Sequence, residues 1–401
     1  MIINKREFVD YFVLTLLVAI SGIPSFRTKL LTLLELSILF LIFILRKKNF
    51  DIRFLWFFVL LIVITFLQVL KFQFFPIVTN LGLLIMVMNA YLIVKILGKK
   101  FISYYVNILY YMAIVSFFFL FPFLLFPSLA LFFINSITPV FDSLDPEHHS
   151  IIIYNITYNA GYLKNSGPFW EPGAFAGYLI IAYVFNFFRE SAKITKKNIV
   201  LFIAILTTLS TTAYLTLFIF FFFVYFKKIK NIVFKIGAIT IIILIGIYAY
   251  SSFDFLGEKI EKQIKVAYIM GIKKSDNTQR FLSILRDIKD LKGHEWIGRG
   301  GHDKTRYDLL PTDDFIIRTV GLTDILVRVG IIVFIIMFYF LYKSICVYLE
   351  WLQEKKMMYC LGIFIAILVT LTSEVYFNLP MYWSLLFLQF VYNQKKEIRK
   401  I

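Results

Sequence analysis

Hydrophobic positions along the chain gather in long blocks that are separated by polar connections. Many blocks approach the roughly 20 apolar residues that a helix needs to cross the ~30 Å hydrocarbon layer of a membrane. Helices suit such blocks because they satisfy their own backbone hydrogen bonds where water is absent. The blocks lie at about 8–23, 29–45, 52–70, 74–97, 102–126, 169–188, 199–226, 231–250, 320–342, 358–376 and 379–393. This pattern predicts an all-α, polytopic membrane protein with about 11–12 transmembrane helices.

The connections between the blocks are either short and basic or long and mixed in charge. The short ones lie at 46–48, 99–100, 189–197, 227–230, 355–356 and in the C-terminal tail. Basic loops tend to stay on the cytoplasmic side of a membrane. The two long connections are then expected outside, as a smaller loop at 127–168 and a large extracytoplasmic loop at 251–319. No internal repeat divides the sequence, so residues 1–401 are predicted to form a single integral membrane domain.

The block at 199–226 decides the topology. Its 28 residues would form one helix of about 42 Å, which is long for a single pass. Hydroxyl side chains on either side of Ser210 can satisfy backbone groups that a break would free. Two short passes that meet near Ser210 would place 227–230 inside, both long loops outside and both termini in the cytoplasm. One long tilted helix is the alternative.

Composition and charge agree with a membrane protein. The chain is 60% hydrophobic and 17% charged, whereas a soluble domain usually has about 45–50% apolar residues. The net charge of +17 could indicate nucleic acid, but no recognition motif accompanies it. We therefore predict no nucleic-acid partner. Cys346 and Cys360 have no spacing that predicts a metal site or a disulfide framework.

The stretch from Lys164 to Gly177 contains the first candidate site residue. Glu171 followed by Pro172 suits a helix start, with a carboxylate near the positive end of the helix dipole and proline in the first turn. The small residues that follow would let another helix approach closely, which is their plain structural explanation. A carboxylate at the outer membrane boundary is costly unless it is paired or functional. Glu171 is therefore either a structural partner of an arginine or a site residue.

The 251–319 loop carries several arginines, among them Arg280, Arg299 and Arg318. Arginine forks bind phosphate oxygens in a bidentate way. The glycine-rich run at 298–301 can bring backbone amides close to an oxyanion, although it lacks the ending of a P-loop. A solvated loop of mixed charge also explains much of this composition.

Asp324 and Arg328 lie inside the apolar block at 320–342, four positions apart and hence on one helix face. Ionisable residues within a membrane segment are functional candidates by default. The alternative is a local ion pair that merely tolerates burial.

Metal sites are not favoured by the sequence. Glu147, His148 and His149 are adjacent, and adjacent residues do not face one another on a helix. Asp313 and Asp314 could hold a divalent cation, but a polar loop end explains them more simply. We predict neither a metal nor a cofactor.

Three features of the chain resemble the bacterial O-antigen polymerases, which are related to the O-antigen ligases. They are the Phe-Trp-Glu-Pro-Gly core of 167–177, the Leu-Ser-Thr-Thr-Ala run at 209–213, and Arg280 followed by the 298–300 run and a helix with Gly-Ile-Ile at 330–332. The first 150 residues match only as hydrophobic helices. Lys164 stands where many members have arginine, and Thr211 stands where ligases often have arginine. Thr323 and Asp324 stand near the position of a His-Asn pair in ligases, which favours a polymerase.

The resemblance implies a glycosyltransferase of lipopolysaccharide or other surface-polysaccharide biosynthesis, located in the bacterial inner membrane. Such an enzyme moves a growing glycan from undecaprenyl pyrophosphate onto a lipid-linked repeat unit at the outer face of that membrane. Cationic side chains would bind the leaving pyrophosphate, and a carboxylate would accept the proton of the attacking hydroxyl. The candidate pyrophosphate ligands are Arg280, Arg299, Arg318 and Arg328, and the candidate catalytic carboxylates are Glu171 and Asp324. A metal is not required if arginines neutralise the leaving group, and a separate chain-length regulator is the usual partner.

Other functions remain open at this point. A ligase-like glycan transferase would use the same chemistry. A lipid-linked oligosaccharide flippase would also have about twelve passes, but it does not need so large an outer loop. A solute transporter should show inverted repeats with broken helices, and the pattern predicts a single broken block. A scaffold without enzymatic activity would leave Glu171, Asp324 and Arg328 without a reason.

Overall fold

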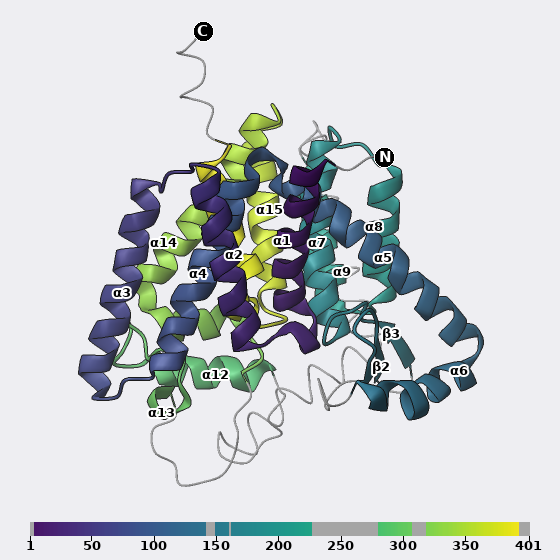
Figure 1. The fold of residues 1–401 in the computed structure, drawn as a ribbon, viewed down its shortest axis with the longest axis horizontal. Helices are drawn as coiled ribbons and strands as arrows, with labels where there is room; N and C mark the ends of the chain where they lie inside the picture. The colour runs from purple at the N-terminus through teal and green to yellow at the C-terminus, as the bar shows by residue number, and fades with distance from the viewer. Residues whose placement is uncertain (1–3, 142–148, 160–161, 227–279, 307–317, 393–401) are drawn as a thin grey trace.

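The computed structural model describes residues 4–141, 149–159, 162–226, 280–306 and 318–392, which are mostly helical. Figure 1 shows the long helices side by side in a bundle, with α12, α13 and a small β-sheet at the same end of it. Within these ranges, three helical stretches are long and apolar enough to cross a membrane: Ile52–Phe72, Ile77–Leu125 and Gly321–Trp351. The helical class and these stretches agree with the predicted all-α membrane protein.

The observed helices begin and end close to the predicted blocks. The N-terminal half contains α1 Lys5–Gly22, α2 Lys29–Leu45, α3 Ile52–Phe72, α4 Ile77–Leu97, α5 Phe101–Leu125, α6 Pro127–Phe132 and α7 Pro172–Arg189. The remainder contains α8 Lys196–Thr207, α9 Thr211–Phe226, α12 Arg280–Leu291, α13 Asp303–Arg306, α14 Gly321–Trp351, α15 Met357–Thr370 and α16 Pro380–Phe387. The block expected at 231–250 lies outside the described residues, as do Asp313 and Asp314.

The predicted break near Ser210 is present. Helix α8 ends at Thr207 and α9 begins at Thr211, while Leu209 between them has a left-handed φ of 51°. The rings of Phe202 and Phe221 lie 6.3 Å apart, although a continuous helix would separate these residues by about 28 Å. The two helices therefore form an antiparallel hairpin, and the alternative of one long helix is wrong.

The segment at 127–168, expected only as a loop, contains ordered structure. Besides α6 it forms an antiparallel sheet of β1 His149–Ser150, β2 Asn155–Asn159 and β3 Tyr162–Asn165, in the order β1-β2-β3. Ile156 pairs with Asn165 in this sheet. The Asn165 amide donates to Ser116 on α5 and to Thr207 on α8, each at 3.0 Å. These bonds fix the sheet against the bundle just before α7 begins.

Helix α14 contains a second break, which the hydrophobic pattern does not predict. Gly330 has φ 74° and ψ 170°, so the helix is interrupted one third of the way along. The segment at 294–300, which we call the plug loop, fills the gap. Within the plug loop, the amides of Arg299 and Gly300 donate to the carbonyls of Val327 (2.7 Å) and Arg328 (3.1 Å).

Three further hydrogen bonds complete the closure, two to the broken helix and one to the plug loop. The Ile331 amide donates to the Glu295 carbonyl at 2.8 Å. From α3, the Gln68 amide donates both to Arg328 O at 2.8 Å and to Ile297 O at 2.6 Å. The backbone groups freed by Gly330 are thus satisfied by protein rather than by water, as helix breaks in membranes require.

Glycine at position 330 is required both by conformation and by space. A Cβ atom there would clash with the carbonyl of Trp296 in the plug loop. We expect Gly330→Ala to destabilise the protein severely or to prevent its folding. Gly293→Ala is the matched control, because Gly293 also has a positive φ (79°) but nothing lies within 4 Å of its Cβ position. This control should lose only the ~1–2 kcal/mol of a left-handed alanine. Thermal unfolding in detergent measures both, and equal losses would contradict the role given to the plug loop.

Candidate functional site

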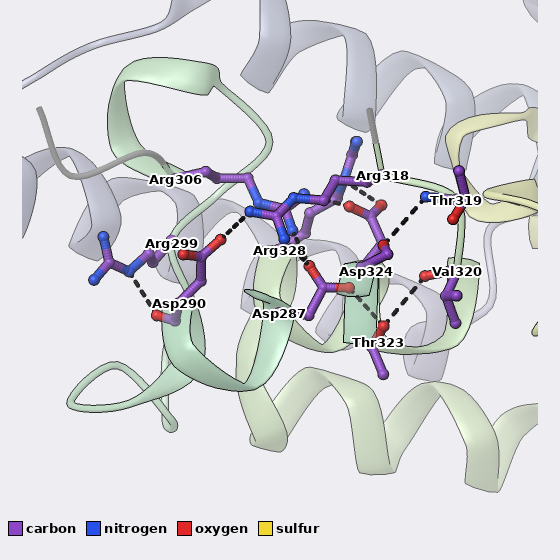
Figure 2. A network of polar contacts seen from close by, with 11 residues as sticks. Asp287, Asp290, Arg299, Arg306, Arg318, Thr319, Val320, Thr323, Asp324 and Arg328 are labelled. Atoms are coloured by element: carbon purple, nitrogen blue, oxygen red, sulfur yellow. Dashed lines mark hydrogen bonds and ion pairs between the residues drawn. The ribbon is translucent and has the colours of Figure 1, made fainter. Parts of the chain in front are cut away.

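Arginines and aspartates interleave at the end of the bundle where α12, α13, the plug loop and the start of α14 meet. Figure 2 shows this Arg–Asp network, in which ion pairs and hydrogen bonds connect successive elements of the chain. Its members are Asp287, Asp290, Arg299, Arg306, Arg318, Asp324 and Arg328.

Arg306 is the centre of the network. Its guanidinium bridges Asp287 at 2.9 Å and Asp324, and the arginine side chain is only 2% exposed. Asp287 also accepts a 2.5 Å hydrogen bond from the Thr323 hydroxyl. Arg306 therefore ties α12 to α14, a connection that the sequence pattern did not indicate.

Arg318 and Arg299 both bind other members of the network. Arg318 forms ion pairs with Asp287 at 3.1 Å and Asp290 at 2.5 Å, with 6% of its side chain exposed. Arg299 donates from Nε to the Asp290 carbonyl at 2.6 Å and from a terminal nitrogen to the Thr305 carbonyl at 3.2 Å. Through these contacts Arg299 and Arg318, both predicted pyrophosphate ligands, bind α12 to α13 and to the segment before α14.

The expected oxyanion cradle at 298–301 is used differently. The amides of Arg299 and Gly300 donate hydrogen bonds to carbonyls of α14. A Cβ at Gly298 would lie 2.5 Å from the carbonyl of Val327. Glycine there permits the plug loop to approach the broken helix, so its backbone binds protein rather than an anion.

Asp324 and Arg328 form the predicted ion pair along one helix face, with Arg328 Nε 2.7 Å from Asp324 Oδ2. Asp324 is fully buried, and its other oxygen faces Arg306. A carboxylate held between two guanidinium groups is a poor proton acceptor, because both cations stabilise its charged form. Arg328 differs from the rest of the network, since 24% of its side chain is exposed.

A groove with a cavity volume of about 550 Å³ begins beside Arg328. Its lining includes Arg27 from the α1–α2 connection, Lys29 at the start of α2 and Gly301 from the segment after the plug loop. Apolar residues at the start of α4 also line it, among them Ile77, which is 52% exposed. The lining of the groove therefore combines cations with apolar side chains.

Glu171 lies in a second cluster, next to a residue that sequence reasoning missed. Glu171 occupies the N-cap position of α7, directly before Pro172. Glu374 lies in the turn after α15, and its carboxyl interacts electrostatically with that of Glu171. A Cβ on Gly173 would lie 3.3 Å from Glu171 Oε1 and 3.7 Å from Glu374 Oε1, so the two groups converge. We call Glu171 and Glu374 the carboxyl pair.

The surroundings of the carboxyl pair are polar but largely closed. Trp170 lies beside Glu374. Arg280 lies 3.7 Å from Glu374 Oε1 and donates to the Thr212 hydroxyl at 3.2 Å. Burial and the neighbouring Glu171 raise the pKa of Glu374 well above its ordinary value, although Arg280 opposes the shift. A signal for Glu374 was present, because it is an acidic residue inside the apolar block at 358–376.

Trp170 connects the groove to the carboxyl pair. The Arg27 guanidinium lies 4.7 Å above the centre of the Trp170 ring, in cation–π geometry. Arg27 lines the groove, and Trp170 lies beside Glu374. Trp170 therefore stands between a cation of the groove and the carboxyl pair. Of the site residues predicted from sequence, Glu171 and Arg280 lie in this second cluster. The others lie in the Arg–Asp network: Arg299, Arg318, Asp324 and Arg328.

Removal of the central arginine should destabilise the protein. Arg306→Met leaves Asp287 and Asp324 buried with one cation fewer, and breaking such a pair costs about 3–5 kcal/mol. The control is Lys355→Ala, which removes an exposed 2.7 Å pair with Glu350 and should change stability by about 1 kcal/mol or less. Thermal unfolding in detergent compares the two. Indistinguishable midpoints would mean that the network does not hold α12 to α14.

Comparison with known proteins adds no assignment. No protein-family model matches the chain, and no curated protein is similar to it at a significant level. The functional argument therefore starts from the groove, the carboxyl pair and the sequence features described above.

Proposed function

We propose that this protein polymerises surface polysaccharide in the manner of the O-antigen polymerases, as a glycosyltransferase of the bacterial inner membrane. It would transfer a growing glycan from undecaprenyl pyrophosphate onto a lipid-linked repeat unit at the outer face. The observation that carries the proposal is the position of Trp170, which stacks on Arg27 of a groove lined by cations and apolar residues and lies beside Glu374 of the carboxyl pair. In this proposal the chain has about 11–12 passes with both termini cytoplasmic, and a chain-length regulator is its protein partner.

The groove suits the two parts of a polyprenyl pyrophosphate. Arg27, Lys29 and Arg328 line its cationic part, and arginine forks match phosphate oxygens well. Ile77, Val78 and Leu81 line its apolar part, each about half exposed, and would contact the isoprenoid chain. Of the pyrophosphate ligands predicted from sequence, the proposal keeps Arg328 and adds Arg27 and Lys29. It leaves out Arg299 and Arg318, because their side chains bind other members of the Arg–Asp network.

The carboxyl pair suits the acceptor end of the reaction. An acceptor hydroxyl oxygen forms a bond to the anomeric carbon while the bond from that carbon to the pyrophosphate oxygen breaks. The hydroxyl proton passes to the Glu171 carboxylate, and the electron pair leaves with the lipid pyrophosphate. Cations beside the leaving oxygens favour this step because they stabilise charge that develops in the transition state. Arg280, beside the pair, is placed to orient the acceptor or the pair itself.

A transporter is the second candidate, and one observation favours it. Discontinuous helices are typical of transporters, and α14 is broken at Gly330 in addition to the hairpin of α8 and α9. Protein backbone fills the break in α14, however, so it does not line an open path. Purified protein in liposomes separates the two functions: a polymerase lengthens lipid-linked repeats, whereas a flippase moves them unchanged.

The proposal predicts a specific loss at Arg328. Arg328→Lys keeps a positive charge beside Asp324 but removes the fork, so we expect polymer formation to fall by about 10²–10³. Arg53→Lys is the control, because Arg53 is 41% exposed and pairs only loosely with Asp51, at 3.7 Å. Deletion cells that carry each variant are scored by polysaccharide ladder, with membrane levels checked by blot. A normal ladder from Arg328→Lys would remove Arg328 from the pyrophosphate site.

The arginine-based groove also predicts that no divalent cation is needed. Purified enzyme should elongate lipid-linked repeats at an unchanged rate in EDTA, because guanidinium and ammonium groups neutralise the leaving pyrophosphate. The rate is measured with and without added magnesium or manganese. Loss of activity in EDTA and its recovery on addition of either metal would contradict this mechanism.

A further inference from the structure

We propose that Gly82 on α4 is a specificity-determining residue of the groove, and that the space left by its missing side chain holds the first isoprene unit of the lipid carrier, directly after the pyrophosphate. The identity of this chain rests on the proposed function, whereas the open space at Gly82 does not. A glycine in an apolar block is usually explained by helix packing, so the sequence does not single out this position.

The fold gives no reason for glycine at position 82. Gly82 lies early in α4 with an ordinary helical conformation and without a positive φ, so other residues could adopt its backbone angles. No atom of the described residues lies within 4 Å of the position that its Cβ would take. Glycine is also among the poorest helix formers. Helix α4 is therefore weakened here by a residue that neither conformation nor packing requires.

Other helix glycines show what a packing role looks like in this molecule. A Cβ on Gly177 would clash with the Tyr376 hydroxyl, and one on Gly362 would lie 2.6 Å from the Cβ of Phe223. These glycines let a neighbouring element approach closely, as is common between membrane helices. Gly82 has no such neighbour among the residues that the structure describes.

Gly82 lies at the centre of the α4 face that lines the groove. Residues three and four positions away on either side share one helix face with it. All four line the groove together with Gly82: Val78, Thr79, Ile85 and Met86. The open space beside Gly82 is therefore part of the groove, and glycine is typical of sites where the backbone approaches a ligand closely.

The space at Gly82 is about one helical turn from a cation of the groove. A Cβ on Gly301 would lie 3.2 Å from both Arg328 Nη1 and Thr79 Cγ2, so the Arg328 guanidinium lies beside Thr79. Thr79 and Gly82 are three positions apart on α4, or about 4.5 Å along its axis. A chain attached to an anion at Arg328 can therefore reach Gly82 with its first carbon atoms.

Charge and shape both favour an isoprenoid carrier as the occupant. Arg27, Lys29 and Arg328 contribute cations, and the described lining residues include no acidic side chain, so the ligand is expected to be anionic. An isoprene unit carries a methyl branch close to the pyrophosphate, and this branch needs lateral room that a straight acyl chain does not. The missing side chain of Gly82 provides such room at the level where the branch would lie.

Binding of geranylgeranyl pyrophosphate to the purified protein in detergent tests the role of this space. Gly82→Ala places a methyl group in it and should weaken binding about fourfold, which is the contribution of one buried CH₂ group. Gly82→Phe fills the space and should weaken binding by more than about 50-fold, the equivalent of three such groups or more. Unchanged affinity in Gly82→Phe would overturn the proposal.

Val59→Phe is the matched control for the larger variant. Val59 is exposed on α3 and does not line the groove, so the same aromatic side chain is added outside the groove. The control should bind geranylgeranyl pyrophosphate as the wild type does. An equal loss of affinity in Val59→Phe and Gly82→Phe would contradict a specific role of Gly82.

A straight-chain ligand tests whether the space accepts the methyl branch. Hexadecyl pyrophosphate matches the main chain of geranylgeranyl pyrophosphate in length but has no branches. Gly82→Ala should bind it nearly as well as the wild type does, so the preference for the branched chain should fall about fourfold. Phosphatidylglycerol, an anionic lipid with straight acyl chains, is measured in the same way. An equal loss for both pyrophosphates, or a loss seen only with phosphatidylglycerol, would overturn the assignment to an isoprene unit.

Thermal unfolding without ligand gives a readout that a purely structural glycine would not give. Alanine forms helices better than glycine, and its Cβ would meet no described atom at position 82. Gly82→Ala should therefore unfold at a higher temperature than the wild type although it binds the lipid more weakly. A lower unfolding temperature would mean that the fold requires this glycine, and would overturn the inference.

The outcomes for the inference and for the proposed function are distinguishable. If geranylgeranyl pyrophosphate binds with the expected dependence on residue 82 but the wild type forms no polymer from lipid-linked repeats, the proposed function fails and the lipid site at Gly82 stands. If the wild type forms polymer and Gly82→Phe both binds the lipid and polymerises as the wild type does, the inference fails and the proposed function stands.

Discussion

The break in α14 at Gly330 is the constraint on which the end of the bundle that carries α12 and α13 depends. A helix interrupted in an apolar setting exposes backbone groups that water cannot reach, and each unsatisfied group is costly. The plug loop supplies the missing hydrogen bonds to Val327, Arg328 and Ile331. Gln68 supplies another to Arg328 and also donates to Ile297 in the plug loop. Because the plug loop continues into α13, this closure also fixes Arg306 at the centre of the Arg–Asp network. The same break places Arg328 with its backbone in the closure and its side chain at the groove.

Charge is divided between two environments at this end of the bundle. The Arg–Asp network is dense and buried, and its ion pairs bind segments to one another. The arginines at the groove and beside the carboxyl pair are more exposed, with 24% of the Arg328 side chain and 36% of the Arg280 side chain accessible. A buried pair adds little net stability compared with apolar packing, but breaking it is costly. The network therefore fixes the arrangement of the site, whereas the partly exposed groups can contact a ligand.

Much of the fold could be predicted because it follows from local pattern. Apolar runs gave the helix limits to within a few residues in most cases, and the hydroxyl residues around Ser210 indicated the hairpin. Gly330 was different, because its closing partners lie about 30 residues away in the plug loop and more than 200 away at Gln68. A glycine inside an apolar block says nothing about such distant donors.

The sequence could propose candidates for the site but not their contacts. Glu171 and Arg328 became candidates because charged residues are rare at such positions. Glu374 met the same criterion, but its neighbour Glu171 is distant in sequence, so no spacing drew attention to the pair. Arg299 and Arg318 could not be separated from ligand residues by type alone. Only their contacts with Asp290 and Asp287 show that they are committed to the fold.

The hairpin of α8 and α9 has a consequence for the depth of the site. Its arms of 12 and 16 residues measure about 18 and 24 Å, less than the ~30 Å of a hydrocarbon layer. Each arm is therefore shorter than such a layer, and Thr212 near the hairpin tip contacts Arg280 beside the carboxyl pair. For the proposed reaction, a hairpin that begins at one face of the layer would place this contact below the opposite face, within reach of a lipid headgroup.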